Sequence, residues 1–157
     1  MVKHKKIFHF TFYEIETELI KKKINKLFNS AYEIAKKAYS PYSNFNVGAA
    51  VLLENKKIIT GNNQENIAYP SGLCAERTAL FYTKSKYLNQ NILAIAIIAL
   101  KNNEITDNPV TPCGACRQVI LEYSSMQVKK IKLFLIGKHK SIFIPNAENL
   151  MPLKFSF

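Results

Sequence analysis

Residues 112–118 read Pro-Cys-Gly-Ala-Cys-Arg-Gln, and residues 74–79 read Cys-Ala-Glu-Arg-Thr-Ala. All of the chain's cysteines lie in these two stretches: Cys74, Cys113 and Cys116. A Cys-x-x-Cys pair with a distant third cysteine offers three thiolates to one zinc ion, and three protein ligands leave a position open for water, as in catalytic zinc sites. The carboxylate of Glu76, two residues after the first cysteine, is placed to move protons beside such a metal.

Other interpretations of the cysteines remain open. A structural zinc site would need a fourth ligand, and none of the histidines lies within a few residues of a cysteine: His4, His9 and His139. Buried cysteines without a metal are also common, but Pro112 and Gly114 predict a tight turn that aims the two neighbouring sulfurs at one point. A disulfide would leave an odd cysteine in a chain with no other sign of secretion. We therefore predict one zinc ion per chain.

The only arginines in the chain directly follow the two motifs, Arg77 after Glu76 and Arg117 after Cys116. Guanidinium groups suit anionic partners and would withdraw charge from the thiolates, although an ordinary position on a helix surface is the alternative for both. Residues 75–82 and 116–123 read as helices, so both motifs are expected at helix N-termini. The dipole and the free amides there favour thiolate over thiol.

The periodicity of apolar residues indicates strands that alternate with helices. In chain order, the expected elements are a helix at 16–37, a strand at 47–53 with a hairpin partner at 57–60, a helix at 75–82, a strand at 92–100, a helix at 116–123, strands at 131–136 and 141–144, and a helical turn at 147–150. Such an order implies a sheet covered on both faces. We predict an α/β fold, a three-layer α/β/α sandwich with a mixed, roughly five-stranded sheet.

The chain's 157 residues suffice for one domain with a sizeable core. We place that domain at residues 15–157 and interpret residues 1–14 as an N-terminal leader or arm. In this segment Phe8, Phe10 and Phe12 alternate with His9, Thr11 and Tyr13, which would suit a short strand or an interface arm. It is a poor signal peptide, because its apolar stretch is short and contains a histidine.

The formal net charge of +11 raises the question of a nucleic acid or an anionic membrane as partner. The lysines are spread in small clusters without interleaved aromatic residues, so biased composition is the preferred interpretation and a nucleic-acid partner is not expected. The longest apolar run, 92–100, is too short to span a bilayer, so no membrane partner is expected either. The cysteine pattern suits a reducing cytoplasm.

Four stretches together resemble one family: Phe45-x-Val47-Gly48-Ala49-Ala50, Gly61-x-Asn63-x-Glu65-Asn66, Cys74-Ala75-Glu76-Arg77-Thr78-Ala79 and Pro112-Cys113-Gly114-Ala115-Cys116-Arg117-Gln118. In order and spacing, from about Glu18 to Phe155, they are similar to the small, homotetrameric, zinc-dependent cytidine deaminases. The resemblance implies that the three cysteines bind zinc and that Glu76 is the proton shuttle. It also implies hydrolytic deamination of cytidine and deoxycytidine to uridine and deoxyuridine, a step of pyrimidine salvage that needs no redox or organic cofactor.

The resemblance further implies a nucleoside site. Asn63 and Glu65 would hold the ribose hydroxyls, while Phe45 would pack against the pyrimidine ring. The backbone amide of Ala75 would bind the base. From the residues alone, an Asn and a Glu two apart in an extended segment share one face and suit vicinal hydroxyls, but a polar loop in which Asn side chains cap structural turns fits equally. Cytidine and deoxycytidine cannot be ranked, because both side chains are expected at the 3′ side of the sugar.

Two further positions carry an implication about assembly. Tyr69 and Phe155 match positions that in the family reach into or border a neighbouring subunit's site, which implies a homotetramer. The resemblance also assigns Tyr69 to the residues that bind the substrate. The chain departs from the family at Asn62, where a small residue or a Cys is usual, and at Met151, which lies where the family usually has a Leu before Pro. Neither departure touches the chemistry.

Three rival functions remain open. Blasticidin-type deaminases share the zinc motifs, but Arg77 and the pair Asn63 and Glu65 favour a ribonucleoside. A polynucleotide cytosine deaminase would use the positive charge, although those relatives usually have His as the first zinc ligand. A zinc-stabilised nucleic-acid-binding module without catalysis would show salt-dependent binding to an oligonucleotide.

Overall fold

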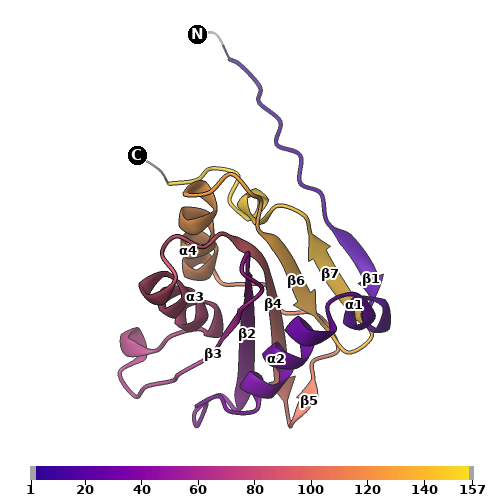
Figure 1. The fold of residues 1–157 in the computed structure, drawn as a ribbon, viewed down its shortest axis with the longest axis vertical. Helices are drawn as coiled ribbons and strands as arrows, with labels where there is room; N and C mark the ends of the chain where they lie inside the picture. Colours follow the sequence, from indigo (N-terminus) through magenta and orange to yellow (C-terminus); the bar gives the residue numbers. More distant parts are fainter. Residues whose placement is uncertain (1–2, 156–157) are drawn as a thin grey trace.

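The computed structural model describes residues 3–155, built around one sheet (Figure 1). The strands are β1 (Tyr13–Glu16), β2 (Phe45–Leu53), β3 (Ile58–Asn62), β4 (Ile92–Lys101), β5 (Glu104–Ile105), β6 (Lys132–Ile136) and β7 (Lys140–Ile144). The helices are α1 (Thr17–Lys23), α2 (Asn25–Ala35), α3 (Ala75–Lys86) and α4 (Gly114–Ser125), with 3₁₀ turns η1 (Tyr69–Ser71) and η2 (Ala147–Leu150). None of the helices within residues 3–155 has the length and apolar character needed to cross a membrane.

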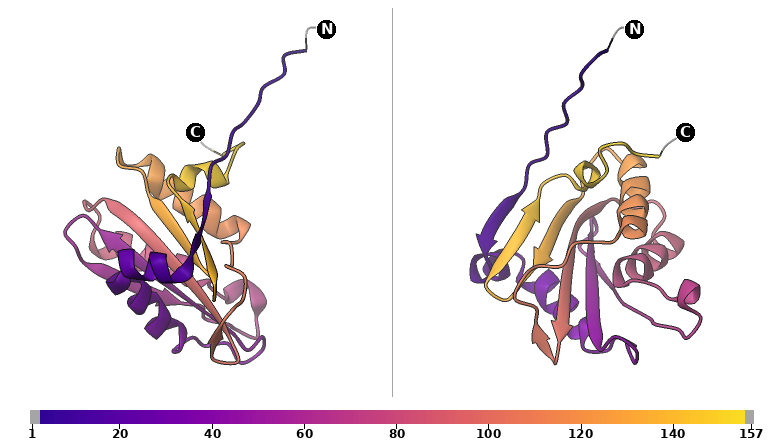
Figure 2. Two further views of the ribbon diagram at one scale, coloured as in Figure 1. Left: turned by 90° about the vertical axis from the view of Figure 1, so that its right-hand side faces the viewer. Right: turned by 180° about the vertical axis from the view of Figure 1, so that it is seen from behind.

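The sheet separates two apolar cores, and each core is covered by a pair of helices (Figure 2). Leu80 of α3 and Ile120 of α4 lie in one core, and Ile20 of α1 lies in the other. The central strand β4 is almost wholly buried, because successive side chains enter opposite cores, as Ile97 and Ile98 do. The predicted three-layer α/β/α sandwich is thereby confirmed.

The sheet has seven strands rather than roughly five, in the order β1-β7-β6-β4-β2-β3 with β5 paired to β4. The parallel pair β4–β6 among antiparallel neighbours makes it mixed, as predicted. The two additional strands are β1 and β5, of four and two residues. Strands this short contain too little alternation to be detected in a sequence. β1 begins at Tyr13, inside the segment interpreted as a leader, and pairs antiparallel with β7.

The single helix expected at 16–37 is two helices, because the chain leaves helical geometry at Ile24, whose φ is −122°. Ile20 before the break and Leu27 after it are both buried in the same core, so the two short helices cover one face together. Neither a proline nor a glycine lies in this segment. The sequence therefore carries no local signal for the break.

Gly61 in β3 permits the close approach of α3 to the sheet. A Cβ at this position would lie 2.8 Å from the carbonyl oxygen of Ala75 and 2.9 Å from the Cα of Ala79, and closer still to the amide nitrogen of Ala79. These are backbone atoms, so no change of rotamer relieves the overlap. We expect Gly61→Ala to lower the free energy of unfolding by about 3 kcal/mol, measured by denaturant unfolding of the zinc-loaded protein.

Gly114 provides the matched control for that substitution. It is the first residue of α4, and a Cβ there would meet no atom within 4 Å. We expect Gly114→Ala to unfold within about 0.5 kcal/mol of the unmodified chain. A Gly61→Ala protein as stable as Gly114→Ala would contradict the tight packing of α3 on β3.

Candidate functional site

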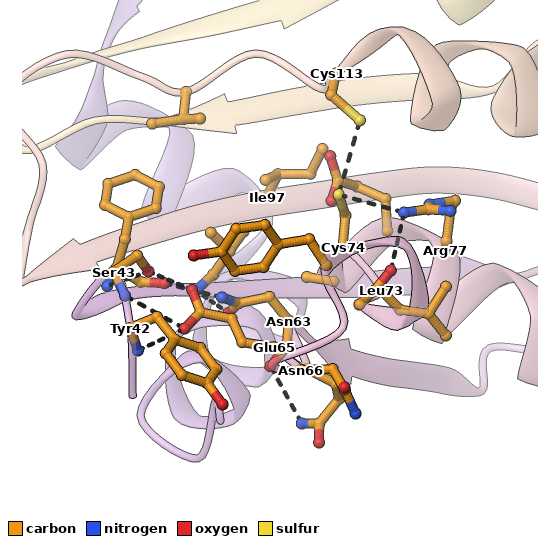
Figure 3. A pocket seen from close by; sticks show the side chains of 18 of the residues that line it. Tyr42, Ser43, Asn63, Glu65, Asn66, Leu73, Cys74, Arg77, Ile97 and Cys113 are labelled. Atoms are coloured by element: carbon orange, nitrogen blue, oxygen red, sulfur yellow. Dashed lines mark hydrogen bonds between the residues drawn. The ribbon is translucent and has the colours of Figure 1, made fainter. Parts of the chain in front are cut away.

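The three cysteine side chains converge at the N-termini of α3 and α4. Cys74 is the N-cap of α3, Cys113 is the N-cap of α4, and Cys116 lies within the first turn of α4. The Sγ atoms of Cys74 and Cys113 are 3.7 Å apart, and those of Cys113 and Cys116 are 3.4 Å apart. Figure 3 shows the Cys113 sulfur directed toward Cys74 across the space between the two helices. The fold therefore brings the two motifs to one point.

The convergence within the second motif does not come from the tight glycine turn expected there. Gly114 is helical, and no glycine among residues 3–155 has a positive φ. Cys113 has an extended backbone at the N-cap, and Cys116 follows one helical turn later. Positions three apart on a helix share a face, which brings the two sulfurs together. Arg117 fixes the start of this helix, because its Nε donates to the carbonyl oxygen of Pro112 at 2.8 Å.

The sulfur arrangement fits a zinc ion. Tetrahedral coordination with Zn–S bonds of about 2.3 Å places neighbouring sulfurs about 3.8 Å apart, and the three Sγ atoms here lie within 4.8 Å of one another. Within residues 3–155 the candidate ligands form this one group of cysteines, so no described histidine completes a closed structural site. The Nε of Arg77 is buried and has no hydrogen-bond partner in the described chain, a cationic donor beside an anionic ligand set.

Cys74 is a readily ionised thiol. Its pKa is lowered to about 5 by a hydrogen bond with Cys116 and by Arg77, whose Nη2 lies 3.8 Å from the Cys74 sulfur. The hydrogen bond with Cys74 and burial raise the pKa of Cys116. A thiolate is thus present at neutral pH for a cation to bind. The predicted influence of Arg117 on the sulfurs stays a prediction, because its hydrogen bond goes to the backbone.

Glu76 is buried next to this cluster, with 4% of its surface exposed. Burial raises the pKa of its carboxyl, and the negative charge of Cys74 acts in the same direction. A carboxyl whose pKa is moved toward the working pH can both accept and return a proton within one reaction. Glu76, Cys74 and Cys113 line the same cavity, so the carboxyl and two of the sulfurs border one space.

The cavity has a volume of about 790 Å³ and lies between β2, the loop after β3 and the start of α3 (Figure 3). Every residue that the resemblance assigns to the nucleoside lines it: Phe45, Asn63, Glu65, Tyr69 and Ala75. Val47 and Ile97 add apolar wall. Apolar walls with a few polar groups are typical of small-molecule sites. Phe155 does not line the cavity and lies exposed near the C-terminus, so its predicted contact with a neighbouring subunit stays a prediction.

Asn63 is bonded to the backbone of β2 through both ends of its amide. Its Oδ1 accepts from the amide of Val47 at 2.7 Å, and its Nδ2 donates to the carbonyl oxygen of Phe45 at 2.9 Å. The sequence left open a structural role for this side chain as the cap of a turn, whereas these bonds go to a strand. The amide still carries a second N–H and a second lone pair, so the same bonds present Asn63 rigidly at the wall of the cavity.

Glu65 is held by a group that the sequence analysis missed. Its Oε2 accepts from the amides of Tyr42 and Ser43 at 2.9 and 3.3 Å, and its Oε1 accepts from the Ser43 hydroxyl (Figure 3). These hydrogen bonds, that of the hydroxyl foremost, lower the pKa of Glu65. The only sequence signal is Pro41 with its polar neighbours, which predicts a turn but not what the turn contacts.

Comparisons with known proteins agree with this geometry. Residues 21–133 match the family model described as the cytidine and deoxycytidylate deaminase zinc-binding region. A cytidine deaminase of Sporosarcina psychrophila is 45% identical over 133 residues, which cover 85% of this chain and 91% of that protein. One of Halalkalibacterium halodurans is 44% identical over 103 residues, 66% of this chain and 74% of that protein. A solved cytidine deaminase from Burkholderia pseudomallei has a TM-score of 0.70 at 34% identity, covering 84% of this chain and 98% of that one.

Proposed function

Because the chain belongs to the cytidine and deoxycytidylate deaminase family, we propose that it deaminates cytidine and deoxycytidine to uridine and deoxyuridine by zinc-dependent hydrolysis, in pyrimidine salvage. The observation that carries this proposal is the meeting of three thiol ligands with a buried carboxyl at the wall of one cavity. The relatives described above lend no support to a blasticidin-type or polynucleotide substrate.

The proposed chemistry divides between the metal and Glu76. Cys74, Cys113 and Cys116 would hold the zinc ion, which when bound would supply the Lewis acid that makes a water molecule acidic at neutral pH. Glu76 accepts the proton that this water loses as its oxygen attacks C4 of the cytosine ring, and delivers a proton to N3. It then takes the second proton from the hydroxyl now on C4 and passes it to the exocyclic amino group; the C4–N bond breaks, ammonia leaves and the C4 carbonyl forms. The raised pKa of the buried Glu76 carboxyl supports this exchange of protons near neutral pH.

The nucleoside is proposed to bind along the cavity wall. Phe45 packs against the pyrimidine ring, and the amide of Ala75 donates to the base. That amide is at the first residue of α3, where N–H groups have no acceptor within the helix. Asn63 and Glu65 bind the ribose hydroxyls, since an ionised carboxylate accepts from a hydroxyl and the remaining amide N–H donates to one.

Ser43 is expected to act on the substrate through Glu65. In Ser43→Ala the carboxylate loses the hydroxyl that orients its Oε1, so we expect KM for cytidine to rise about fivefold while kcat changes little. The pKa of Glu65 is lowered by this hydroxyl and should rise when it is removed. The loss of binding on the acid side should therefore begin at a higher pH in the variant. Steady-state kinetics across the acidic pH range measure both effects.

Ser125→Ala is the control for that prediction. The Ser125 hydroxyl donates to a carbonyl oxygen one turn earlier in α4 and lies exposed, away from the cavity lining. The control should keep the KM and the pH profile of the unmodified protein. An equal loss of kcat and no shift of the acidic limb in Ser43→Ala would indicate a general disturbance instead of a positioning role.

We also propose a homotetramer, with Tyr69 and Phe155 at or near a neighbouring subunit's site. These two side chains are 79% and 67% exposed, so both are accessible for contact with other copies. A cytoplasmic location is proposed because all three cysteines are free thiols, which a reducing compartment maintains. The catalytic domain is proposed to comprise residues 15–157.

The function is tested by following the ultraviolet change when purified protein meets cytidine or deoxycytidine. We expect turnover that disappears after chelation and returns when zinc is restored. Absence of turnover on both nucleosides, in protein shown to hold zinc, would overturn the proposal. Binding to an oligonucleotide would then be measured across salt concentrations.

A further inference from the structure

Residues 3–12 form an arm that runs away from the body of the protein (Figures 1 and 2). Ile7, Phe8, Phe10 and Phe12 are 67%, 49%, 41% and 46% exposed, although they are large apolar side chains. The rings of Phe10 and Phe12 stack with centroids 5.6 Å apart, as residues two apart on one face of an extended chain can do. The arm thus has the side-chain alternation of a strand without a neighbouring strand in the described chain.

The arm continues β1 beyond the end of β7, its one neighbour in the sheet within the described residues. β1 pairs with β7 from Glu16 opposite Lys140 to Tyr13 opposite Phe143. β7 ends one residue later, and the next residue, Pro145, has no N–H to donate. β1 is also the first strand in the sheet order, so its outer edge is unpaired within residues 3–155. A long apolar edge of this kind is a template for pairing with another chain.

We propose that the arms of two copies of this chain pair antiparallel about a two-fold axis at Phe10, so that each arm also extends along β1 of the other copy. Phe10 then lies opposite the partner's Phe10, and Phe8 lies opposite the partner's Phe12. On the other face, Ile7 lies opposite the partner's Tyr13. Opposed residues of an antiparallel pair are on the same face of the sheet, so the six phenylalanine rings form one cluster.

The charges of the segment are complementary in this register. The half before the phenylalanines is basic and the half after them is acidic. Antiparallel pairing centred on Phe10 places Lys6 opposite the partner's Glu14 and His4 opposite the partner's Glu16. Centring on Phe12 instead would place Glu14 opposite the partner's Phe10, and a parallel pair would place like charges opposite each other. Opposite charges stabilise directly opposed positions and like charges destabilise them.

A second copy of the chain suits the whole segment better than other occupants do. A nucleic acid or an anionic membrane would attract the basic half but repel Glu14 and Glu16. An isologous pair satisfies both halves at once and closes on itself, so it forms no open fibre. The inference concerns surfaces outside the cavity and is independent of the proposed reaction.

Cysteine cross-linking tests the register in the zinc-loaded full chain. At the two-fold axis, Phe10→Cys brings two Cα atoms within the roughly 4.4–6.8 Å that a disulfide requires. Thr11→Cys is the matched control, because Thr11 lies opposite the partner's His9 and the two introduced thiols would be beyond that range. Under mild oxidation we expect a covalent dimer with Phe10→Cys and several-fold less with Thr11→Cys, read by intact mass. No dimer with Phe10→Cys, or equal dimer with both variants, would overturn the proposal.

Charge reversal tests the pairing without new cysteines. Lys6→Glu and Glu14→Lys should each weaken self-association by about tenfold, measured by sedimentation velocity over a dilution series. The double variant should return to within about threefold of the unmodified chain, because the opposed charges are restored with exchanged signs. A double variant as weak as either single one would overturn the proposal. The proposal would also be overturned if Glu14→Lys left self-association unchanged while Lys6→Glu lost binding to anionic vesicles or oligonucleotides.

Discussion

Replacing Glu76 with glutamine is expected to lower kcat for cytidine by about 10³-fold or more while the protein keeps its zinc. Glutamine has nearly the same shape but cannot accept and return a proton near neutral pH. Glu76 is 4% exposed, and a neutral amide is tolerated at such a position better than a charge. The three sulfurs are untouched by the change. Steady-state kinetics and metal analysis on the same sample measure both parts of the prediction.

Glu122→Gln is the control, because it makes the same chemical change on the exposed surface of α4. It should keep kcat within about twofold of the unmodified protein. Substantial turnover by zinc-loaded Glu76→Gln would mean that another group moves the proton. Loss of zinc in that variant would mean that Glu76 helps to bind the metal.

Replacing Cys113 with alanine is expected to remove zinc and to lower the Tm on the order of 10 °C. Cys74 caps α3, whereas Cys113 caps α4 and Cys116 lies in its first turn, so an ion bound by all three links two helices. That link exists only in the folded chain, and the free energy of zinc binding therefore adds to the stability of the fold. Metal analysis and thermal unfolding, each with and without a chelator, measure the effect.

Chelation of the unmodified protein should give nearly the same Tm as Cys113→Ala, and the variant itself should be insensitive to the chelator. Gly114→Ala, one residue away, should keep both zinc and Tm, because nothing surrounds its added methyl group. Unchanged zinc content in Cys113→Ala would refute the assignment of this ligand. If the Tm falls in Cys113→Ala but chelation does not change the Tm of the unmodified protein, the variant is destabilised by lost side-chain packing and not by loss of zinc.

Both predictions concern groups held at helix starts. Cys74 precedes α3, Glu76 lies in its first turn, and Cys113 precedes α4. Two helices on the same face of the sheet thus direct their N-terminal dipoles at one cluster of sulfurs. Gly61 lets β3 approach α3 closely, so the sheet fixes the position of α3.

The sequence by itself determined the elements whose signals are local. The apolar run at 92–100 predicted β4, and the periodicity around the two cysteine motifs predicted α3 and α4. The residue types of the candidate metal centre could also be predicted locally, because the thiols and the carboxyl lie at fixed spacing in two short stretches that indicate a metal site. The order of these strands and helices along the chain predicted the three-layer fold, which the structure and the solved relative confirm.

Only the tertiary structure decided the features that depend on distant backbone. The clamp of Ser43 on Glu65 joins residues 22 apart, and the bonds of Asn63 to β2 join residues 16 and 18 apart. The strand β1 exists because β7, more than a hundred residues later, supplies its hydrogen bonds. The break at Ile24 lets Ile20 and Leu27 pack into the same core, and the residues around Ile24 do not predict that packing. Periodicity reports which face of an element is buried, but not which backbone groups lie opposite it, and those partners become neighbours only when the chain has folded.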